Sequence, residues 1–419
     1  MSLFPCNVSS RSSLPFHRIA KLAAFLLTLS AFSAQADTYY VATNGSDSNP
    51  GSEAAPFKRI NFAYSKVGAG DTIIVKPGVY TEQVGSSYCF RFNKDGSASA
   101  PITIKSERVW GAVLDGKNDE SLCGAVVWLN GSHHVIEGFE ITNASHDGIV
   151  IYGSGGNRII SNHIHHNGNN GALQPPPSPV SSGITQASTK GDQFIANYIH
   201  HNGRSASHAE FKQNLDHGMY LHGDDMFIVN NIVANNRDHG IQLAGQNSLD
   251  NARIYNNVIA SNGRSGIMFW LSVRGTSVIN NIFYFNGRGS AIDSYTPDVS
   301  GATFDRNIFF GQTADIDVSG TGFTTGTNYT VDPLFANAAS GDFGLQAGSP
   351  AIDKGVTLAQ VPTDFTGKAR PEGAAYDIGT FEGAGSKADV LPAVAAGIPG
   401  GGTPTNRSTS RGGLGNCFK

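Results

Sequence analysis

The chain between residues 146 and 269 repeats a short pattern of apolar and polar positions. Each unit has a glycine followed by alternating apolar residues, as at 218–221 (Gly-Met-Tyr-Leu) and 240–243 (Gly-Ile-Gln-Leu). An alternation of period two predicts β-strands with one face in a core. The first and third residues after each glycine are expected to point inward. The residue before the glycine and the second residue after it are expected to point outward.

A second repeat, built on asparagine, is interleaved with the first, as at 230–232 (Asn-Asn-Ile) and 256–258 (Asn-Asn-Val). Polar or proline-rich insertions at 169–182 and 204–214 account for the longest glycine spacings, so the underlying period is in the low to middle twenties. That length suits one coil of an all-β solenoid, a parallel β-helix, in which coils stack strand on strand. Asparagines recurring at one coil position predict an internal ladder of side-chain amides.

The two ends of the solenoid are expected to differ from its middle. Short strands are predicted around 38–43, 72–76, 101–105 and 125–129. Residues 56–67 carry apolar side chains at helical spacing, which predicts an amphipathic helix that caps the open first coil. The β-helix is expected over 37–331, a glycine- and proline-rich end segment over 332–382, and a flexible tail over 383–419.

Composition narrows the compartment and the partners. Of the 419 residues 39% are apolar and only 15% charged, and the net charge is −4, so no global positive field recruits nucleic acid or an anionic membrane. Residues 1–36 have a basic region, an apolar run and Ala-Gln-Ala, the order of a cleavable signal peptide. We expect a secreted or periplasmic protein without a membrane span. The oligomeric state is left open.

The cysteines leave two interpretations. In an oxidising compartment Cys89 and Cys123 form a disulfide, or else they are two buried thiols in neighbouring strands. Their spacing with Cys417 does not resemble a zinc cluster.

Four stretches, two near each end of the predicted β-helix, resemble known proteins. Residues 39–47 (Tyr-Tyr-Val-Ala-Thr-Asn-Gly-Ser-Asp) and 70–80 (Gly-Asp-Thr-Ile-Ile-Val-Lys-Pro-Gly-Val-Tyr) resemble the opening of secreted right-handed parallel β-helix proteins of the pectate lyase-like superfamily. Residues 332–335 (Asp-Pro-Leu-Phe) and 377–382 (Asp-Ile-Gly-Thr-Phe-Glu) resemble the ending of bacterial exported β-helix proteins. The resemblance implies the fold, and it leaves open the reaction, because lyases, hydrolases, epimerases and adhesins share this scaffold. The acidic calcium cluster and lysine motif of the calcium-dependent pectate lyases with ten coils are not visible in this sequence.

The outward positions of two adjacent repeats gather titratable side chains. Because 218 to 240 is one period without an insertion, these side chains are expected on one solvent-facing sheet surface: His217, Tyr220, His222, His239 and Gln242. We expect His217 or His239 to act as a base and Tyr220 as an acid. Lys212, in the insertion before Asp216, is a second candidate base.

A row of arginines is expected beside this cluster, at one turn of successive coils: Arg204, Arg237, Arg264 and Arg288. Guanidinium groups pair bidentately with carboxylates, so the row suggests an acidic polysaccharide as partner. Removing the C5 proton of a uronate requires a neutralised carboxylate, a base and, for cleavage, an acid near O4. Arg237 and Arg264 are the preferred carboxylate ligands.

Several of these residues also have simpler explanations. Exposed histidines on a solenoid are often only polar surface. The pairs 165–166 and 200–201 repeat with Ile-His-His-Asn-Gly, which turn structure explains more readily than metal binding, and no metal site is expected there. Asp216 and Asp238 either bind calcium or accept hydrogen bonds from turn amides, and the second role is the commoner. Trp270 is either a platform for a sugar ring or an ordinary exposed aromatic residue.

The sequence therefore predicts an exported enzyme that cleaves a uronic-acid polysaccharide of pectate or alginate type by β-elimination. This reaction requires no particular cofactor, and the sequence leaves open whether calcium takes part. The alternatives are a C5-epimerase, a glycoside hydrolase, or a carbohydrate-binding or adhesive β-helix without catalysis. A hydrolase would need two suitably spaced carboxylates, and the obvious supply is Asp216, Asp224, Asp225 and Asp238.

Overall fold

The structure, a computed structural model, describes residues 36–84, 88–119, 121–153, 155–168, 181–187, 189–204, 215–287, 289–295, 298–385 and 387. The predicted signal peptide and most of the predicted tail lie outside these residues.

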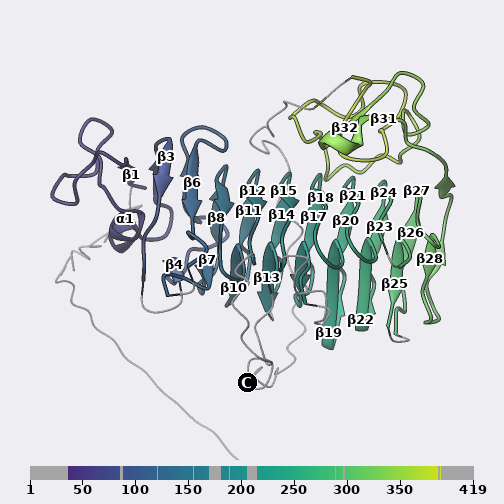
Figure 1. The fold of residues 1–419 in the computed structure, drawn as a ribbon, viewed down its shortest axis with the longest axis horizontal. Helices are drawn as coiled ribbons and strands as arrows, with labels where there is room; N and C mark the ends of the chain where they lie inside the picture. Colours follow the sequence, from purple (N-terminus) through teal and green to yellow (C-terminus); the bar gives the residue numbers. More distant parts are fainter. Residues whose placement is uncertain are drawn as a thin grey trace, which may run out of the picture. The chain divides into compact units, whose positions relative to one another are not determined.

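Three parallel sheets carry most of the described chain. Successive strands pass from sheet C to sheet A to sheet B, and each strand pairs in parallel with its counterpart one turn of chain later. We call one such turn a coil. Figure 1 shows the strands of successive coils standing side by side, from α1 at one end to β28 at the other. This is the right-handed parallel β-helix that the repeats and the resemblance predicted.

The strands are short, and most have three to five residues. The eleven strands of sheet A are β1 (Thr38–Val41), β2 (Thr72–Val75), β5 (Ile102–Ser106), β8 (His134–Glu137), β11 (Arg158–Ile160), β14 (Gln193–Ile195), β17 (Phe227–Val229), β20 (Arg253–Tyr255), β23 (Ser277–Ile279), β26 (Thr303–Asp305) and β29 (Thr324–Thr325). The ten strands of sheet B are β3 (Gly78–Tyr80), β6 (Ala112–Asp115), β9 (Glu140–Thr142), β12 (His163–His165), β15 (Tyr198–His200), β18 (Ile232–Ala234), β21 (Val258–Ala260), β24 (Ile282–Tyr284), β27 (Ile308–Phe310) and β30 (Tyr329–Thr330). The nine strands of sheet C are β4 (Tyr88–Phe92), β7 (Ala125–Leu129), β10 (Ile149–Tyr152), β13 (Ile184–Ala187), β16 (Met219–Leu221), β19 (Ile241–Asp250), β22 (Ile267–Arg274), β25 (Ile292–Ser294) and β28 (Ile316–Asp317).

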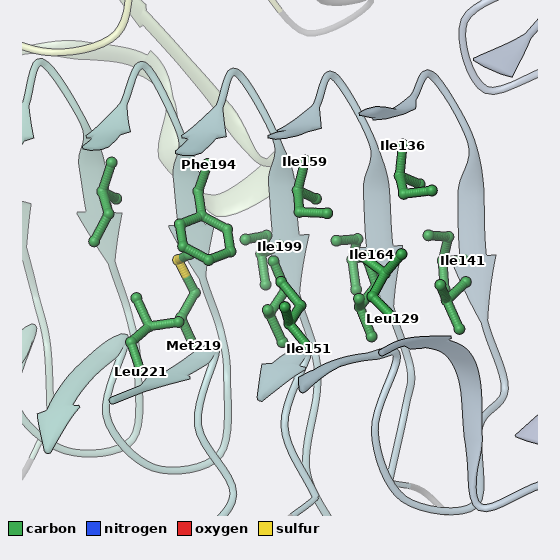
Figure 2. Packing of buried hydrophobic residues seen from close by; sticks show 14 of the residues in the cluster. Leu129, Ile136, Ile141, Ile151, Ile159, Ile164, Phe194, Ile199, Met219 and Leu221 are labelled. Carbon is green, nitrogen blue, oxygen red and sulfur yellow. The ribbon is translucent and has the colours of Figure 1, made fainter. Parts of the chain in front are cut away.

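The core is a set of stacked columns of apolar side chains. Figure 2 shows Ile136 and Ile159 of sheet A at equivalent positions of neighbouring coils, and Ile141 and Ile164 of sheet B likewise. The predicted inward residues of sheet C, among them Met219 and the next coil's Ile241, are fully buried. The alternation therefore predicted correctly which face of each strand lies in the core.

Asparagine amides form two internal ladders. In the turns between sheets A and B, the Nδ2 of Asn231 donates to Oδ1 of Asn257, which in turn donates to Asn281. A parallel ladder in the turns between sheets B and C includes Asn236 and Asn262. The side-chain amides also donate to backbone carbonyls, so buried polar groups at the corners are satisfied. The sequence predicted one ladder, and the structure has two.

The two ends of the β-helix are finished differently. Helix α1 (Ile60–Lys66) packs against β1, β2 and β4 and buries Ile60 and Ala63, in agreement with the predicted cap. Cys89 and Cys123 form a disulfide with a Cα–Cα distance of 5.3 Å, so the disulfide is the correct one of the two interpretations.

The end segment after Asp332 packs back onto the outside of the β-helix. It contains the antiparallel pair β31 (Phe335–Asn337) and β32 (Asp342–Leu345) and a 3₁₀ turn at Ala338–Ser340. Phe335 and Phe343 join a second hydrophobic cluster with outward residues of sheets A and B, such as Phe227 and Ile232. This segment covers part of sheets A and B.

Candidate functional site

The outer face of sheet C carries three rows of side chains that run along the β-helix. The corner glycine of each coil sets their register, because a Cβ at Gly218 would lie 2.6 Å from both the Gly240 carbonyl oxygen and Val233 Cγ1. The glycine hydrogen therefore faces the interior, and the residue before it faces outward. The first row is Asp147, Ser182, His217, His239 and Ser265; the second is Val150, Thr185, Tyr220, Gln242, Met268 and Asp293; the third is Tyr152, Ala187, His222, Ala244, Trp270 and Tyr295.

His217 and His239 stack in adjacent coils, as the repeat predicted. Their ring centroids are 5.4 Å apart, and the Tyr220 ring lies 5.3 Å from that of His217. The prediction that both imidazoles face solvent is wrong, because His217 is 0% and His239 2% exposed. A side chain can point outward from a strand and still be covered by its neighbours, which alternation alone does not reveal.

The electrostatics of His239 follow from this burial. Burial, with His217 beside it, lowers the pKa of His239 well below its usual value, so the imidazole is neutral. The backbone N–H of Ser265 donates to its Nδ1 at 3.1 Å, which places the proton of the neutral ring on Nε2. These contacts hold the ring in place and suit a positioning role better than contact with a polymer.

Tyr220 and His222 are two partly exposed titratable residues of this face. Tyr220 lies in β16 and His222 directly follows this strand; their ring centroids are 4.4 Å apart and their planes are at 79°. The backbone N–H of His222 donates to Oε1 of the inward Gln186, which ties the end of the strand to the previous coil. Burial lowers the pKa of His222 to about 4, so its ring is neutral at pH 7. Gln242 pairs with Tyr220 in register and is buried.

Three arginines of the predicted row lie in the described part of the chain, and each of them makes an internal ion pair. Arg204 Nε lies 2.9 Å from Asp216 Oδ2, and Arg237 Nε lies 3.6 Å from the same oxygen. Arg264 Nε lies 3.2 Å from Asp238 Oδ1. Exposure of the side chain rises along the row, from 11% for Arg204 through 25% for Arg237 to 39% for Arg264. Arg204 is thus a structural residue, whereas Arg264 keeps a face toward solvent.

The same contacts decide between the two roles of the aspartates. Asp238 Oδ2 accepts hydrogen bonds from the backbone N–H groups of Leu215 and Asp216, both at 3.0 Å. Asp216 accepts from Arg204 through both oxygens. Protein donors therefore already occupy the carboxylate oxygens. The two aspartates stabilise the turns and pair with the arginines, and they do not fit a calcium site.

Stacked aromatic side chains occur at both ends of the three rows. Trp270 stacks on Tyr295 with centroids 4.4 Å apart and planes at 9°, and Tyr295 is 65% exposed. Trp128 stacks on Tyr152 in the same way at 5.8 Å. Tyr295 escaped the sequence analysis, although it stands four residues after the glycine equivalent Ala291, as Trp270 does after Gly266.

Asp147 is a buried acid at the start of the first row that the sequence analysis did not select. Burial raises its pKa to about 7. It accepts hydrogen bonds from the N–H of Ser182 at 2.9 Å and from Thr185 Oγ1 at 2.7 Å. Asp147 stands immediately before the corner glycine Gly148, as His217 and His239 stand before theirs, and this position could have identified it from the sequence. The two other predicted site residues, Lys212 and Arg288, lie outside the described residues.

Comparison with known proteins fits this architecture. The family model described as "Right handed beta helix region" matches residues 108–283 and 196–333, together more than half of the chain. A second model, "Pel9A-like, right handed beta helix region", matches residues 39–176. The chain therefore belongs to the right-handed β-helix family.

Individual relatives are more distant. Pectate lyase L of Dickeya dadantii (strain 3937) is 33% identical over 138 residues, which are 32% of this chain and 32% of that protein. The uncharacterized protein YwoF of Bacillus subtilis (strain 168) is 28% identical over 142 residues, 30% of this chain and 28% of that protein. These matches span about a third of the curated relatives' length. The crystal structure of pectate lyase Pel9A superposes with a TM-score of 0.59 at 20% identity, over 83% of this chain and 96% of that one, which shows the shared fold.

The described residues contain no helix with the length and apolar character that crossing a bilayer would require.

Proposed function

We propose that the protein is an exported polysaccharide lyase that cleaves a uronic-acid polysaccharide, of pectate or alginate type, by β-elimination. The observation that carries the proposal is the Tyr220–His222 pair, partly exposed on the outer face of sheet C and flanked by stacked aromatic residues. The similarity to pectate lyase L and the fold shared with pectate lyase Pel9A support the same class of reaction.

The pair has the two groups that β-elimination needs. The neutral His222 imidazole removes the C5 proton of the uronate, the C4–O4 bond breaks, and a double bond forms between C4 and C5. The Tyr220 hydroxyl gives its proton to the departing O4, and proton return from the imidazolium to the phenolate through solvent restores both groups. A base and an acid on one strand face can act on one sugar residue because their rings are in contact.

Cations and aromatic residues of the same face would bind the polymer. The carbanion-like transition state is stabilised when the substrate carboxylate is neutralised. Arg237 and Arg264 retain the exposed guanidinium surface for this role. The flat faces of Trp270 and Tyr295 suit stacking against a sugar ring. His217 lies against the Tyr220 ring and is itself stacked on His239, so it would hold the Tyr220 ring in place.

A hydrolase is less well supported by the carboxylates. Asp216 and Asp238 are engaged with arginines, and Asp225 Oδ2 lies 3.2 Å from Lys190 Nζ. Asp224 Oδ1 accepts the backbone N–H of Asp250 at 3.1 Å. The four aspartates that the sequence offered for a two-carboxylate mechanism therefore have structural partners.

The proposal is tested by incubating the full-length secreted protein with polygalacturonate, polymannuronate, polyguluronate and glycosaminoglycans. Ultraviolet absorbance of the unsaturated product on one of the uronate polymers is the expected result. New reducing ends without that absorbance would show a hydrolase, and solvent deuterium entering C5 without cleavage would show an epimerase. Binding of a polymer without any of these changes would show a binding module.

A further inference from the structure

Sheet B carries a cluster of histidines that the proposed reaction does not use. Strands β9, β12 and β15 pair so that Glu140, His163 and Tyr198 are cross-strand neighbours, and Thr142, His165 and His200 form the next row. Side chains two residues apart share a face, so the charged and imidazole groups of both rows gather on the outside of the sheet. In the next coil Ile232 and Ala234 occupy these positions and are buried. The imidazoles are thus confined to β12 and β15, and Asp115 of β6, the cross-strand neighbour of Thr142, extends the polar row by one coil on the other side.

Three of these residues bring ligand atoms together. One carboxylate oxygen of Glu140 and one imidazole nitrogen each of His163 and His165 all lie within 4.8 Å of one another. His165 Nε2 lies 3.3 Å from Glu140 Oε1. Two ligand atoms of a tetrahedral zinc ion with bonds of about 2.0–2.1 Å are about 3.3 Å apart. The distance between His165 Nε2 and Glu140 Oε1 already has this value. All three side chains are partly exposed, which leaves an ion a path from solvent.

The neighbouring groups orient the rings as metal-binding histidines are usually oriented. The Nδ1 atom of His165 contacts Thr142 Oγ1 at 3.4 Å and Nδ1 of His166 at 2.8 Å, which leaves Nε2 directed at Glu140. The Trp110 ring lies 4.5 Å from that of His163 and provides an apolar wall. Nε2 of His200 lies 2.6 Å from Nε2 of His163 and fixes that ring.

Turn structure accounts for only some of the repeated histidines. His166 and His201 have positive φ of 52° and end strands β12 and β15, as the turn interpretation predicted. His163, His165 and His200 lie within the strands themselves, where the turn imposes nothing on residue type. A second explanation is needed for three imidazoles and a carboxylate on one face.

We propose that Glu140, His163 and His165 form a site for a divalent transition-metal ion of the zinc class. Two imidazoles and one carboxylate suit zinc better than magnesium or calcium, which prefer oxygen ligands alone. Three protein ligands leave one position for water, and the site joins β9 to β12 on the outside of the β-helix. It lies on a different sheet from Tyr220 and His222, so it does not depend on the proposed reaction.

Metal binding is measured on the full-length protein after treatment with a chelator and its removal. Equilibrium dialysis against Zn²⁺ at pH 7 is expected to give one ion per chain. His163→Ala and His165→Ala should each weaken binding by about 100-fold or more, and Glu140→Gln by about 10-fold. His133→Asn, a partly exposed histidine on the neighbouring coil with φ of 54°, is the matched control and should bind as the parent does.

Two further readouts separate a lost site from a lost fold. Co²⁺ bound to the parent should give the visible absorption of a four-coordinate ion, and the His165→Ala variant should not. Zn²⁺ should raise the Tm of the parent and leave that of His163→Ala unchanged, while both have similar Tm without metal. Absence of stoichiometric Zn²⁺ binding to the parent, or binding that survives in folded His163→Ala and His165→Ala, would overturn the proposal.

Discussion

Asn256 and Asn257 are neighbours in the chain whose side chains serve opposite sides of the β-helix wall. Asn257 lies in the inner ladder, where its Nδ2 donates to the carbonyls of Ile228 and Tyr255 and to Oδ1 of Asn281. Asn256 has φ of 51° and donates outward to the carbonyls of Asp377 and Gly379 in the end segment. One asparagine pair therefore fixes the coil corner and attaches the end segment to it.

This division predicts different effects for the two positions. Asn257→Ala leaves several buried groups of its neighbours without partners, at about 1–3 kcal/mol each, and should lower the free energy of unfolding by several kcal/mol. Asn256→Gly keeps the left-handed backbone and removes the two bonds to the end segment and a 3.4 Å bond from Asn280 Nδ2. It should change global stability much less and make residues 332–382 easier to cleave with protease. Denaturation and limited proteolysis measure the two effects, and equal loss of stability in both variants would contradict the assignment.

The arginine row provides a second matched pair. Arg204→Ala leaves Asp216, with a side chain only 3% exposed, without its closest cation and should cost about 3–5 kcal/mol of stability. Arg264→Ala removes an arginine that is 39% exposed, and Asp238 keeps its two backbone N–H donors, so the cost should be about 1 kcal/mol or less. We expect Arg264→Ala to keep the parent's Tm and to raise the KM for the polymer. A normal KM in this variant would remove Arg264 from the substrate site.

The pH dependence of activity follows from His222. Its pKa is lowered to about 4, so the base form is present above that pH and is lost as pH falls through it. The acidic limb of kcat/KM should therefore lie near pH 4, well below the 6.5 of an ordinary histidine. A limb near pH 7 would instead suggest that the buried Asp147, with a pKa of about 7, controls the reaction.

The disulfide should contribute to stability near the capped end. It joins residues 34 positions apart, and the loop-closure relation assigns such a crosslink about 4 kcal/mol. The double variant Cys89→Ser, Cys123→Ser should unfold at a lower temperature under non-reducing conditions. The parent in reductant should approach the same Tm, and no change in either case would mean that the packing of α1 and β4 stabilises this end by itself.

The repeats predicted the fold because every coil has the same register, so the position of a residue within its repeat determines which face of the strand it occupies. Alternation around the corner glycines fixed which residues of β16 and β19 face the core, and it correctly brought His217 over His239. Exposure could not be predicted in the same way, because it depends on what covers a side chain from other parts of the molecule. The ion pairs of Asp216 with Arg204 and Arg237 also depend on the path of the turns. The sequence repeat alone cannot separate the strand histidines of sheet B from the turn histidines, because it does not show that β12 ends at His165 and β15 at His200.

The catalytic proposal is tested most directly by comparing the parent protein with the variant His222→Ala. The initial rate of unsaturated-product formation is measured for the parent and for His222→Ala on the uronate polymer that the parent cleaves, with polymer binding and Tm measured in parallel. We expect a loss of rate of about 100-fold or more, the usual contribution of a general base, with binding and Tm retained. A folded His222→Ala variant that forms product at the parent's rate would contradict the proposal.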